Sequence, residues 1–282
     1  MDLSSGGSLT DSFTDFIDSF SLEGQRKLLV ENRNNTTHTR FGIMPNFTTR
    51  YLTFGYLISQ RTKARLHRDY GDDFEYAKRR DHGPYAGLNI SLFGGIFKIG
   101  ASAIWLNRKE IKGVQDENLS ADFEDGAHRK GAAVIVTAGA RLTLPFAGLP
   151  TFAAVLRNAA DQNFSGRAAG APDKIRQTLD LGFSLTPQVG KVIRTHFEIN
   201  YKDATNAYGV AKKRQFMAGM EIDIARTFFL RFGYGDGFGS AGIGVRSRKL
   251  EFDLTTYAVD NSPAALRGQE DRRFAMTLSS GF

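Results

Sequence analysis

Most of the chain alternates between apolar and polar positions. Near its C-terminal end the two parities separate cleanly: one carries Phe274, Met276, Leu278, Ser280 and Phe282, and the other carries Ala275, Thr277, Ser279 and Gly281. A period of two residues is that of a β-strand with one apolar and one polar face. We therefore expect residues 271–282 to form the last strand of a sheet that the rest of the chain completes.

The same alternation predicts fourteen strands along the chain. They lie near residues 24–33, 39–47, 50–66, 83–93, 96–111, 128–144, 151–158, 174–187, 191–203, 213–224, 227–235, 238–246, 248–258 and 271–282. Pro45 interrupts the second of these strands, and a proline cannot donate a hydrogen bond to a neighbouring strand.

The connections between these strands alternate in length. Short ones lie at 94–95, 145–150, 188–190, 225–226 and 247, and mostly long, polar ones lie at 67–82, 112–127, 159–173, 204–212 and 259–270. In an antiparallel meander this places the short turns at one rim and the long loops at the other, as in up-and-down barrels of the outer membrane. We predict an all-β fold: an antiparallel up-and-down transmembrane β-barrel of 12 to 14 strands. We prefer fourteen strands. The number would be twelve if the first two predicted segments are not part of the barrel wall.

Composition agrees with a barrel. The chain has 282 residues, 41% of them hydrophobic, and no run approaches the roughly 18 apolar residues that a spanning helix requires. Alternating strands need only half their residues to be apolar, so low overall hydropathy is compatible with a membrane barrel. The absence of cysteine decides little.

The start and the charge of the chain bear on its location. Met1 is followed by Asp2 without the basic start and apolar core of a secretory signal. We expect an exported chain whose signal peptide has been removed, placed in the outer membrane of a Gram-negative bacterium. A net charge of +7 suits outer-membrane lipids and lipopolysaccharide. No dense basic block points to nucleic acid, which we do not expect as a partner.

One stretch near the start has a helical period. Phe13, Phe16, Ile17 and Phe20 follow at i, i+3, i+4 and i+7, which predicts a short amphipathic helix within residues 8–20. We expect two parts: a helical segment at 1–23, and the barrel at 24–282. The helix would be a plug at the periplasmic mouth or a docking element, or simply an amphipathic helix packed on an apolar surface.

The polar parity of the strands carries mixed charges. A soluble sandwich would turn the apolar parity inward, but so many segments would require an improbably wide apolar core, so we expect the polar parity to face a lumen. Its predicted members are Arg141, Arg176, Asp180, Arg194, His196, Glu198, Glu221, Asp223, Arg231, Glu251 and Asp253. Both signs occur on adjacent strands, which favours a structural network over a selective constriction, where acidic and basic residues would segregate.

Few features of the sequence point to a catalytic site. His196 and Glu198 share a face, so a metal or general-base role is geometrically possible, but spacing places no third ligand and no nucleophile. Gly233, Gly235 and Gly237 superficially match a nucleotide-binding spacing, but no helix follows, and a hairpin explains them better. We predict no enzyme activity, no cofactor and no metal; an outer-membrane lipid-modifying enzyme remains the least favoured alternative.

The stretch from Phe228 to Phe282 carries a family resemblance. A strand enters a Gly235-Asp236-Gly237 hairpin, residues 241–245 read AGIGV, and residues 271–273 read DRR before the closing strand. These features resemble the C-terminal part of TraF-like and PorV-like barrels, which are similar in fold to the fatty-acid transporter FadL. Residues 81–93, 94–95 and 97–105 resemble the amino-half hairpin of the same group.

The resemblance and the terminal strand together imply a role. Phe274, Met276, Leu278 and Phe282 would form the signal that the barrel-assembly machinery recognises. PorV-like barrels act as surface partners in secretion, which implies a binding or scaffold barrel with a protein partner of unknown identity. The alternative is a porin-like channel or transporter for small or amphipathic, fatty-acid-like solutes.

Overall fold

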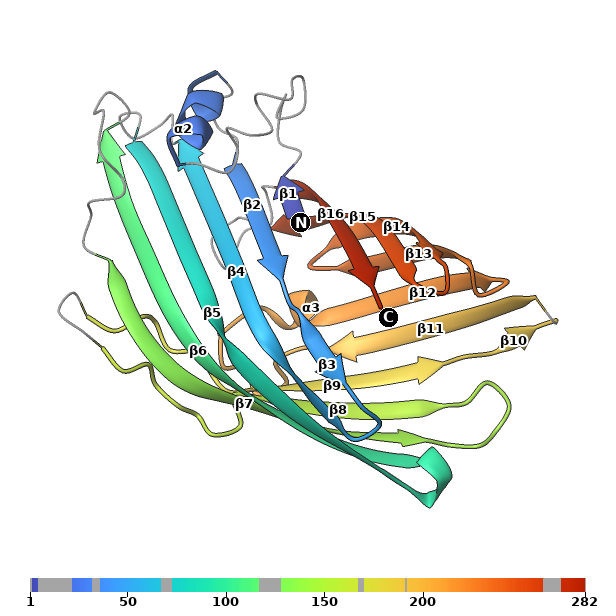
Figure 1. Cartoon of the computed structure of the whole chain (residues 1–282). Helices are drawn as coiled ribbons and strands as arrows, with labels where there is room; N and C mark the ends of the chain where they lie inside the picture. Colours follow the sequence, from blue (N-terminus) through green and yellow to red (C-terminus); the bar gives the residue numbers. More distant parts are fainter. Residues whose placement is uncertain are drawn as a thin grey trace.

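A computed structural model describes residues 2–4, 22–31, 36–66, 73–116, 128–166, 170–190, 192–260 and 270–281. Sixteen strand segments among these residues form one sheet, in which every pairing is antiparallel. Figure 1 shows the sheet curving round on itself. The strands are β1 (Asp2–Ser4), β2 (Thr36–Ile43), β3 (Asn46–Thr48), β4 (Leu52–Leu66), β5 (Asp73–Leu92), β6 (Phe97–Asp116), β7 (Arg129–Thr143), β8 (Thr151–Arg157), β9 (Thr178–Leu185), β10 (Gln188–Val189), β11 (Ile193–Tyr201), β12 (Phe216–Ile224), β13 (Phe228–Gly235), β14 (Phe238–Arg246), β15 (Leu250–Asp260) and β16 (Glu270–Ser280).

The strand pairings run round a complete ring. β2 and β3 both pair with β4, and β9 and β10 both pair with β11, so each couple is one interrupted strand of the wall. Counted this way, the described residues form a wall of fourteen strands. β9 pairs with β11 on one side, and β1 joins β16 to β2 on the other. The predicted antiparallel up-and-down barrel is confirmed.

The strand predicted at 24–33 is wrong, because this stretch is the helix α2 (Leu22–Glu31). Leu22, Gln25 and Leu29 are among its buried residues. They follow at i, i+3 and i+7, which is a helical and not a strand spacing. The expected part boundary at residue 23 falls inside this helix. The fourteenth strand of the wall is instead β1, whose residues we had assigned to the helical segment at 1–23.

The apolar residues of the strands face outward. The alternation alone could not decide between an outward and an inward apolar face. Trp105 is 59% exposed and Phe47 58% exposed, while Phe54, Leu88, Phe232 and Ile243 are also exposed on the outside of the wall. An outward apolar belt around a closed sheet is the arrangement of a transmembrane barrel, since all backbone groups then pair within the wall. No helix among the described residues is long and apolar enough to cross a membrane.

The wall is much taller on one side than on the other. β5 and β6 have 20 residues each, whereas β13 has 8, and about 9 to 11 residues suffice for one crossing. Figure 1 shows this contrast between the long strands β4 to β7 and the short strands β12 to β16. β5 and β6 extend further toward the long-loop end than expected, because we had assigned residues 73–82 and 112–116 to loops.

Helix α2 covers the outer face of this taller side at the long-loop end. Leu22 and Leu29 join a buried cluster with Ala64, Leu66, Phe74, Tyr76 and Ile111. Gln25 donates to Thr39 Oγ1 and accepts from Thr37 Oγ1, both at 3.0 Å. The exposed apolar positions of β4, at Leu52, Phe54, Tyr56 and Ile58, end before the part of the strand under the helix. The upper ends of β4 to β6 therefore stand beyond the apolar belt.

Two short helical turns complete the described structure. η1 (Phe93–Gly95) turns the chain from β5 to β6, and α3 (Lys212–Gln215) precedes β12. Gly94 at φ 66° and Gly95 at φ 97° lie in the left-handed region, where glycine has no steric penalty. This is one of the short turns that the sequence predicted.

Candidate functional site

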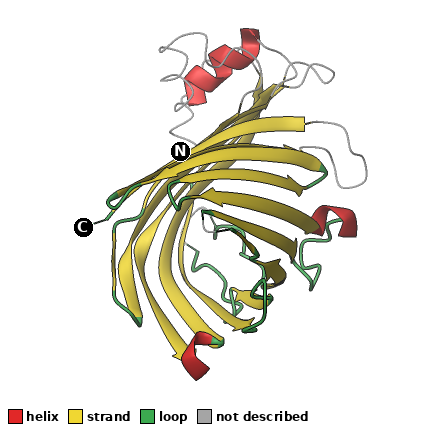
Figure 2. Cartoon of the chain, turned by 90° about the vertical axis from the view of Figure 1, so that its right-hand side faces the viewer, coloured by secondary structure: helices red, strands yellow, loops and turns green. Residues whose placement is uncertain are grey.

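The connection from β8 to β9, which we call the lumen loop (residues 158–177, described at 158–166 and 170–177), folds into the barrel. Figure 2 shows loop segments inside the ring of strands. Phe164, 6% exposed, packs with Leu106 and Ala133 on the inner face of the wall. Ser165 N donates to Ala132 O at 2.9 Å, and Ala132 N donates to Ser165 Oγ at 3.1 Å. These contacts fix the loop along β6 and β7.

The loop approaches β7 most closely at Gly131. A Cβ atom added there would overlap the carbonyl oxygen of Ser165 and lie 2.7 Å from Pro172 Cδ. A residue without a side chain is needed at this position because the backbone of the loop occupies the space. Asn158 closes the base of the loop, as its Nδ2 donates to Ile175 O at 2.6 Å.

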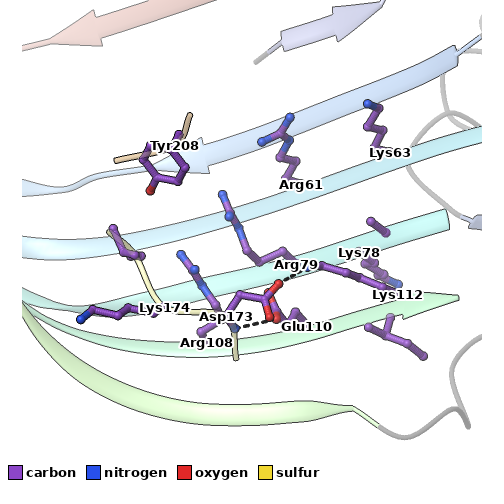
Figure 3. Close-up of a pocket in the computed structure, with 13 residues that line it drawn as sticks. Arg61, Lys63, Lys78, Arg79, Arg108, Glu110, Lys112, Asp173, Lys174 and Tyr208 are labelled. Carbon is purple, nitrogen blue, oxygen red and sulfur yellow. Dashed lines mark hydrogen bonds and ion pairs between the residues drawn. The ribbon is translucent and has the colours of Figure 1, made fainter. Parts of the chain in front are cut away.

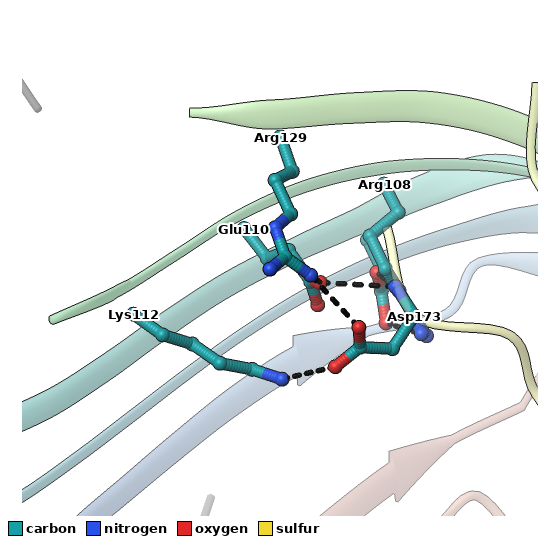
Figure 4. A network of polar contacts seen from close by, with 6 residues as sticks. Arg108, Glu110, Lys112, Arg129 and Asp173 are labelled. Carbon is teal, nitrogen blue, oxygen red and sulfur yellow. Dashed lines mark hydrogen bonds and ion pairs between the residues drawn. The ribbon is translucent and has the colours of Figure 1, made fainter. Parts of the chain in front are cut away.

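An ion-pair network holds the descending half of the loop (Figure 4). Lys112 Nζ donates to Asp173 Oδ2, and Arg129 Nη1 donates to Asp173 Oδ1 at 2.8 Å. Asp173 N donates to Glu110 Oε1 at 3.1 Å. The hydrogen bond from Lys112 and the charges of Lys112 and Arg129 hold the pKa of Asp173 below its usual range. The loop is therefore tied to the wall by a carboxylate that stays charged.

Beside the loop lies a cavity of about 300 Å³, which we call the basic cavity. Its lining includes the cations Arg61, Lys63, Lys78, Arg79, Arg108, Lys112 and Lys174, and the carboxylates Glu110 and Asp173. Figure 3 shows these side chains coming from β4, β5, β6 and the lumen loop. Cations outnumber carboxylates among these described lining residues, which favours a positive potential in the cavity.

Arg108 is a cation of the basic cavity that is held by several contacts. It donates to both oxygens of Asp81, at 2.8 and 3.0 Å, and lies over the ring of Phe164 with 4.8 Å to the centroid. Arg79 lies 3.3 Å from the same Asp81, so two guanidinium groups share one carboxylate. Arg108 thereby joins the wall, the lumen loop and the cavity.

A second loop, between β11 and β12, meets the lumen loop. Tyr208 OH accepts from Arg176 N at 3.2 Å, and the Arg176 side chain donates to Ala207 O. Asp203 orders this second loop by accepting from Tyr208 N at 3.0 Å and Ala207 N at 2.9 Å. Burial alone would raise the pKa of Asp203, but these two N–H groups, the Thr205 hydroxyl and the charge of Arg176 together outweigh it, so the pKa lies below its usual range.

Arg176 is therefore not where the sequence analysis placed it. We expected it on a strand in the lumen, but β9 begins only at Thr178, and Arg176 belongs to the lumen loop, where its guanidinium lies 5.7 Å from the Tyr208 ring. The alternation of β9 was extended too far because the apolar residue Ile175 matches the strand parity while packing inside the barrel.

The other predicted lumen residues occupy the inner face in separate groups. Arg231 Nε donates to Glu221 Oε2 at 2.6 Å, and Arg231 Nη1 donates to Asp253. Elsewhere, Arg157 donates to Asp180 at 2.7 Å and Arg246 donates to Glu251 at 2.6 and 2.9 Å. Arg194 pairs in register with Asp223, and Arg141 with Lys98 and Ala153.

His196 and Glu198 lie together, as their spacing indicated. His196 Nδ1 lies 2.8 Å from Thr186 Oγ1, His196 Nε2 lies 3.5 Å from Glu198, and Glu198 accepts from Asn200 at 2.6 Å. With Arg141 they line a second lumen cavity of about 400 Å³ on the short-turn side. Among the described residues no group of three or more His, Asp or Glu could hold a metal ion. That the protein has no enzyme activity stays a prediction.

Two predicted features fall partly or wholly outside the described residues. The plug helix with Phe13, Phe16, Ile17 and Phe20 lies there entirely, as does Phe282. The remaining residues of the assembly signal, Phe274, Met276 and Leu278, are exposed on the outer face of β16. Their recognition by the assembly machinery stays a prediction.

The sequence analysis missed the lumen loop and the basic cavity. The cavity had a signal, because Arg61, Lys63 and Arg65 alternate on one strand, as do Arg108, Glu110 and Lys112 on another. Charged residues at alternate positions beyond the apolar stretch of a strand indicate that the inner face stays polar where the strand extends past the apolar belt. No periodicity marks residues 158–177 as an inward loop.

Comparison with known proteins identifies no family for this chain. No protein-family model matches the chain, and a search of curated proteins finds no match. Among solved structures, CdiB from Acinetobacter baumannii matches with a TM-score of 0.41 and 11% identity, over 87% of this chain and 50% of that one. The barrel assignment therefore rests on the strand pairing and the outward apolar belt, and the finer resemblance to TraF-like, PorV-like and FadL-like barrels stays a proposal.

Proposed function

We propose that this protein is a barrel of a Gram-negative outer membrane through which small solutes pass, with a preference for anions. The observation that carries the proposal is that the lumen loop narrows the barrel while cavities of about 300 and 400 Å³ remain open on the inner face, on its long-loop and short-turn sides. A narrowed lumen with charged walls is the arrangement by which pores select solutes.

The charge of the narrow section favours anions. The lining of the basic cavity carries seven cations against two carboxylates, and Arg79 and Arg108 share the neighbouring Asp81. A cleft lined by one sign of charge raises the local concentration of oppositely charged solutes. The solute would enter beside the lumen loop, where Tyr208 and Ile175 belong to the apolar part of the lining.

Swelling of liposomes that contain the full chain tests the passage. We expect wild-type protein to admit small solutes slowly. The Asp173→Asn variant should admit them faster, because it removes the carboxylate that binds Lys112 and Arg129. Arg246→Gln, which alters the Arg246–Glu251 ion pair of β14 and β15 away from the loop, serves as the control and should behave like wild type.

The second candidate is the scaffold barrel that docks a protein partner. The contact between the lumen loop and the β11–β12 loop favours it, because Arg176 and Tyr208 join two long loops into one surface at the rim. If liposomes with folded wild-type protein and with Asp173→Asn both exclude all solutes, the passage is refuted and the scaffold becomes the better account. This candidate also agrees with the PorV-like resemblance.

A further inference from the structure

The lumen cavity of about 400 Å³ on the short-turn side, which we call the short-turn cavity, has a floor of small residues between longer polar ones. Two rows of the backbone register form it: Arg141, Ala153, Gly182 and Asn200 in one, and Thr143, Thr151, Ser184 and Glu198 in the other. In these rows the middle strands, β8 and β9, contribute only small side chains. The space over them is therefore bounded by Arg141 of β7 on one side and by Glu198 and Asn200 of β11 on the other.

The carboxylate of Glu198 is held in a fixed position on its side of the cavity. Asn200 Nδ2 donates to Glu198 Oε1 at 2.6 Å, and His196 Nε2 lies 3.5 Å from Glu198 Oε2. Gly182 makes room for this arrangement, because a Cβ atom added there would lie 2.7 Å from Asn200 Oδ1. Apart from His196, no described side chain forms an ion pair with Glu198. The cavity thus presents one oriented negative charge on the β11 side.

Arg141 presents a positive charge on the opposite side. Its neighbours in the register are Lys98 and Ala153, and within the described part of the chain no carboxylate forms an ion pair with it. Three steps between neighbouring strands separate β7 from β11, which is roughly 14 Å along the wall. The side chains of Arg141 and Glu198 both reach into this interval, so the space between the two charges suits a small molecule.

We propose that the short-turn cavity binds a small zwitterion of the amino-acid type. Arg141 would bind the carboxylate through two parallel hydrogen bonds, and Glu198 would accept from the ammonium group. Leu149, which lines the cavity at its short-turn end, would contact an apolar side chain of the ligand. A ligand with one charge, or a neutral sugar, would leave Arg141, Glu198 or both without a counter-charge. The site goes beyond the proposed passage, because binding here requires no movement past the lumen loop.

A saturation-transfer NMR titration of the detergent-solubilised full chain with L-leucine tests the site. Two analogues carry one charge each: N-acetyl-L-leucine has only the carboxylate, and L-leucinamide has only the ammonium group. We expect each analogue to bind about tenfold or more weakly than leucine, because one hydrogen-bonded charge pair is lost.

Substitutions assign each charge of the ligand to its partner. Glu198→Gln should weaken leucine binding by about tenfold without weakening the binding of N-acetyl-L-leucine, which has no ammonium group. Arg141→Gln should weaken leucine binding to a similar extent without weakening the binding of L-leucinamide. The matched control Arg246→Gln/Glu251→Gln neutralises one cation and one carboxylate outside the cavity and should bind leucine as wild type does. Heat-modifiable migration on gels verifies that each variant is folded.

The outcomes separate the site from the passage. Absence of leucine binding to folded wild-type protein overturns the site, as does equal binding of leucine and either analogue. Equal weakening in the control and in the two cavity variants also overturns it, because the effect would then come from the general charge of the lumen. Leucine binding by a barrel that admits no solutes into liposomes refutes the passage alone.

Discussion

At the scale of single residues, Gly131 controls how the lumen loop lies on the wall. We expect Gly131→Ala to displace the loop and raise solute entry into liposomes, because the added Cβ overlaps Ser165 O. Gly139→Ala is the matched control: it lies on the same inner face of β7, and its Cβ meets nothing closer than 3.3 Å. Equal entry rates in both variants would show that the loop does not narrow the barrel.

Asp173 makes the position of the loop depend on pH. Its pKa in the folded chain lies below the usual value of about 3.9, so its contribution to holding the loop is present above that pH and is lost as pH falls through the lowered pKa. Solute entry should stay constant from pH 7 to about pH 5 and rise only below about pH 4. In Asp173→Asn the entry rate should be high and lack this acid rise. An increase in solute entry between pH 7 and pH 5 would show that a group other than Asp173 determines the position of the loop.

At the scale of elements, Arg231 joins three strands through one side chain. It binds Glu221 of β12 and Asp253 of β15 from its position on β13. Replacing it with Met removes the cation that both carboxylates bind, so we expect the free energy of unfolding to fall by about 1–3 kcal/mol. Arg157→Met should cost about 0–1 kcal/mol, since that side chain is 58% exposed and binds one carboxylate. Urea denaturation in detergent measures both, and equal losses would contradict a special role for Arg231.

The elements also show what the sequence could predict. Alternation located β13, β14 and β16 to within about two residues, because burial on one face of a strand imposes the period directly. It failed at α2, where Leu28 and Leu29 permitted either period, and at residues 73–82, where charges outside the apolar belt resemble a loop. The lumen loop was unpredictable, because its position depends on contacts between residues far apart in the chain, such as Glu110 with Asp173.

At the scale of the whole molecule, the ring closes through a very short strand. β1 pairs with Arg273–Ala275 of β16 and with Thr39 and Arg40 of β2 (Figure 1). Toward the short-turn rim, no described residue pairs with residues 277–280 on that side, nor with the facing edge of β3. Unpaired edges are the least protected part of a barrel wall.

Hydrogen exchange of the reconstituted protein tests this seam. Amides of 277–280 should exchange faster than those of β13, which is paired along both edges. Peptides that cover 46–48 should show the same fast exchange. Equal protection of the three regions would mean that a further segment completes the wall between β16 and β3.

The central claim is that the basic cavity makes the barrel a passage that prefers anions. The most direct measurement is the reversal potential of the full chain in a planar bilayer under a potassium chloride gradient. We expect a reversal potential displaced toward the chloride equilibrium potential, with a smaller displacement in Arg61→Gln/Lys63→Gln. Displacement toward the potassium equilibrium potential, or a folded barrel that carries no current, would contradict it.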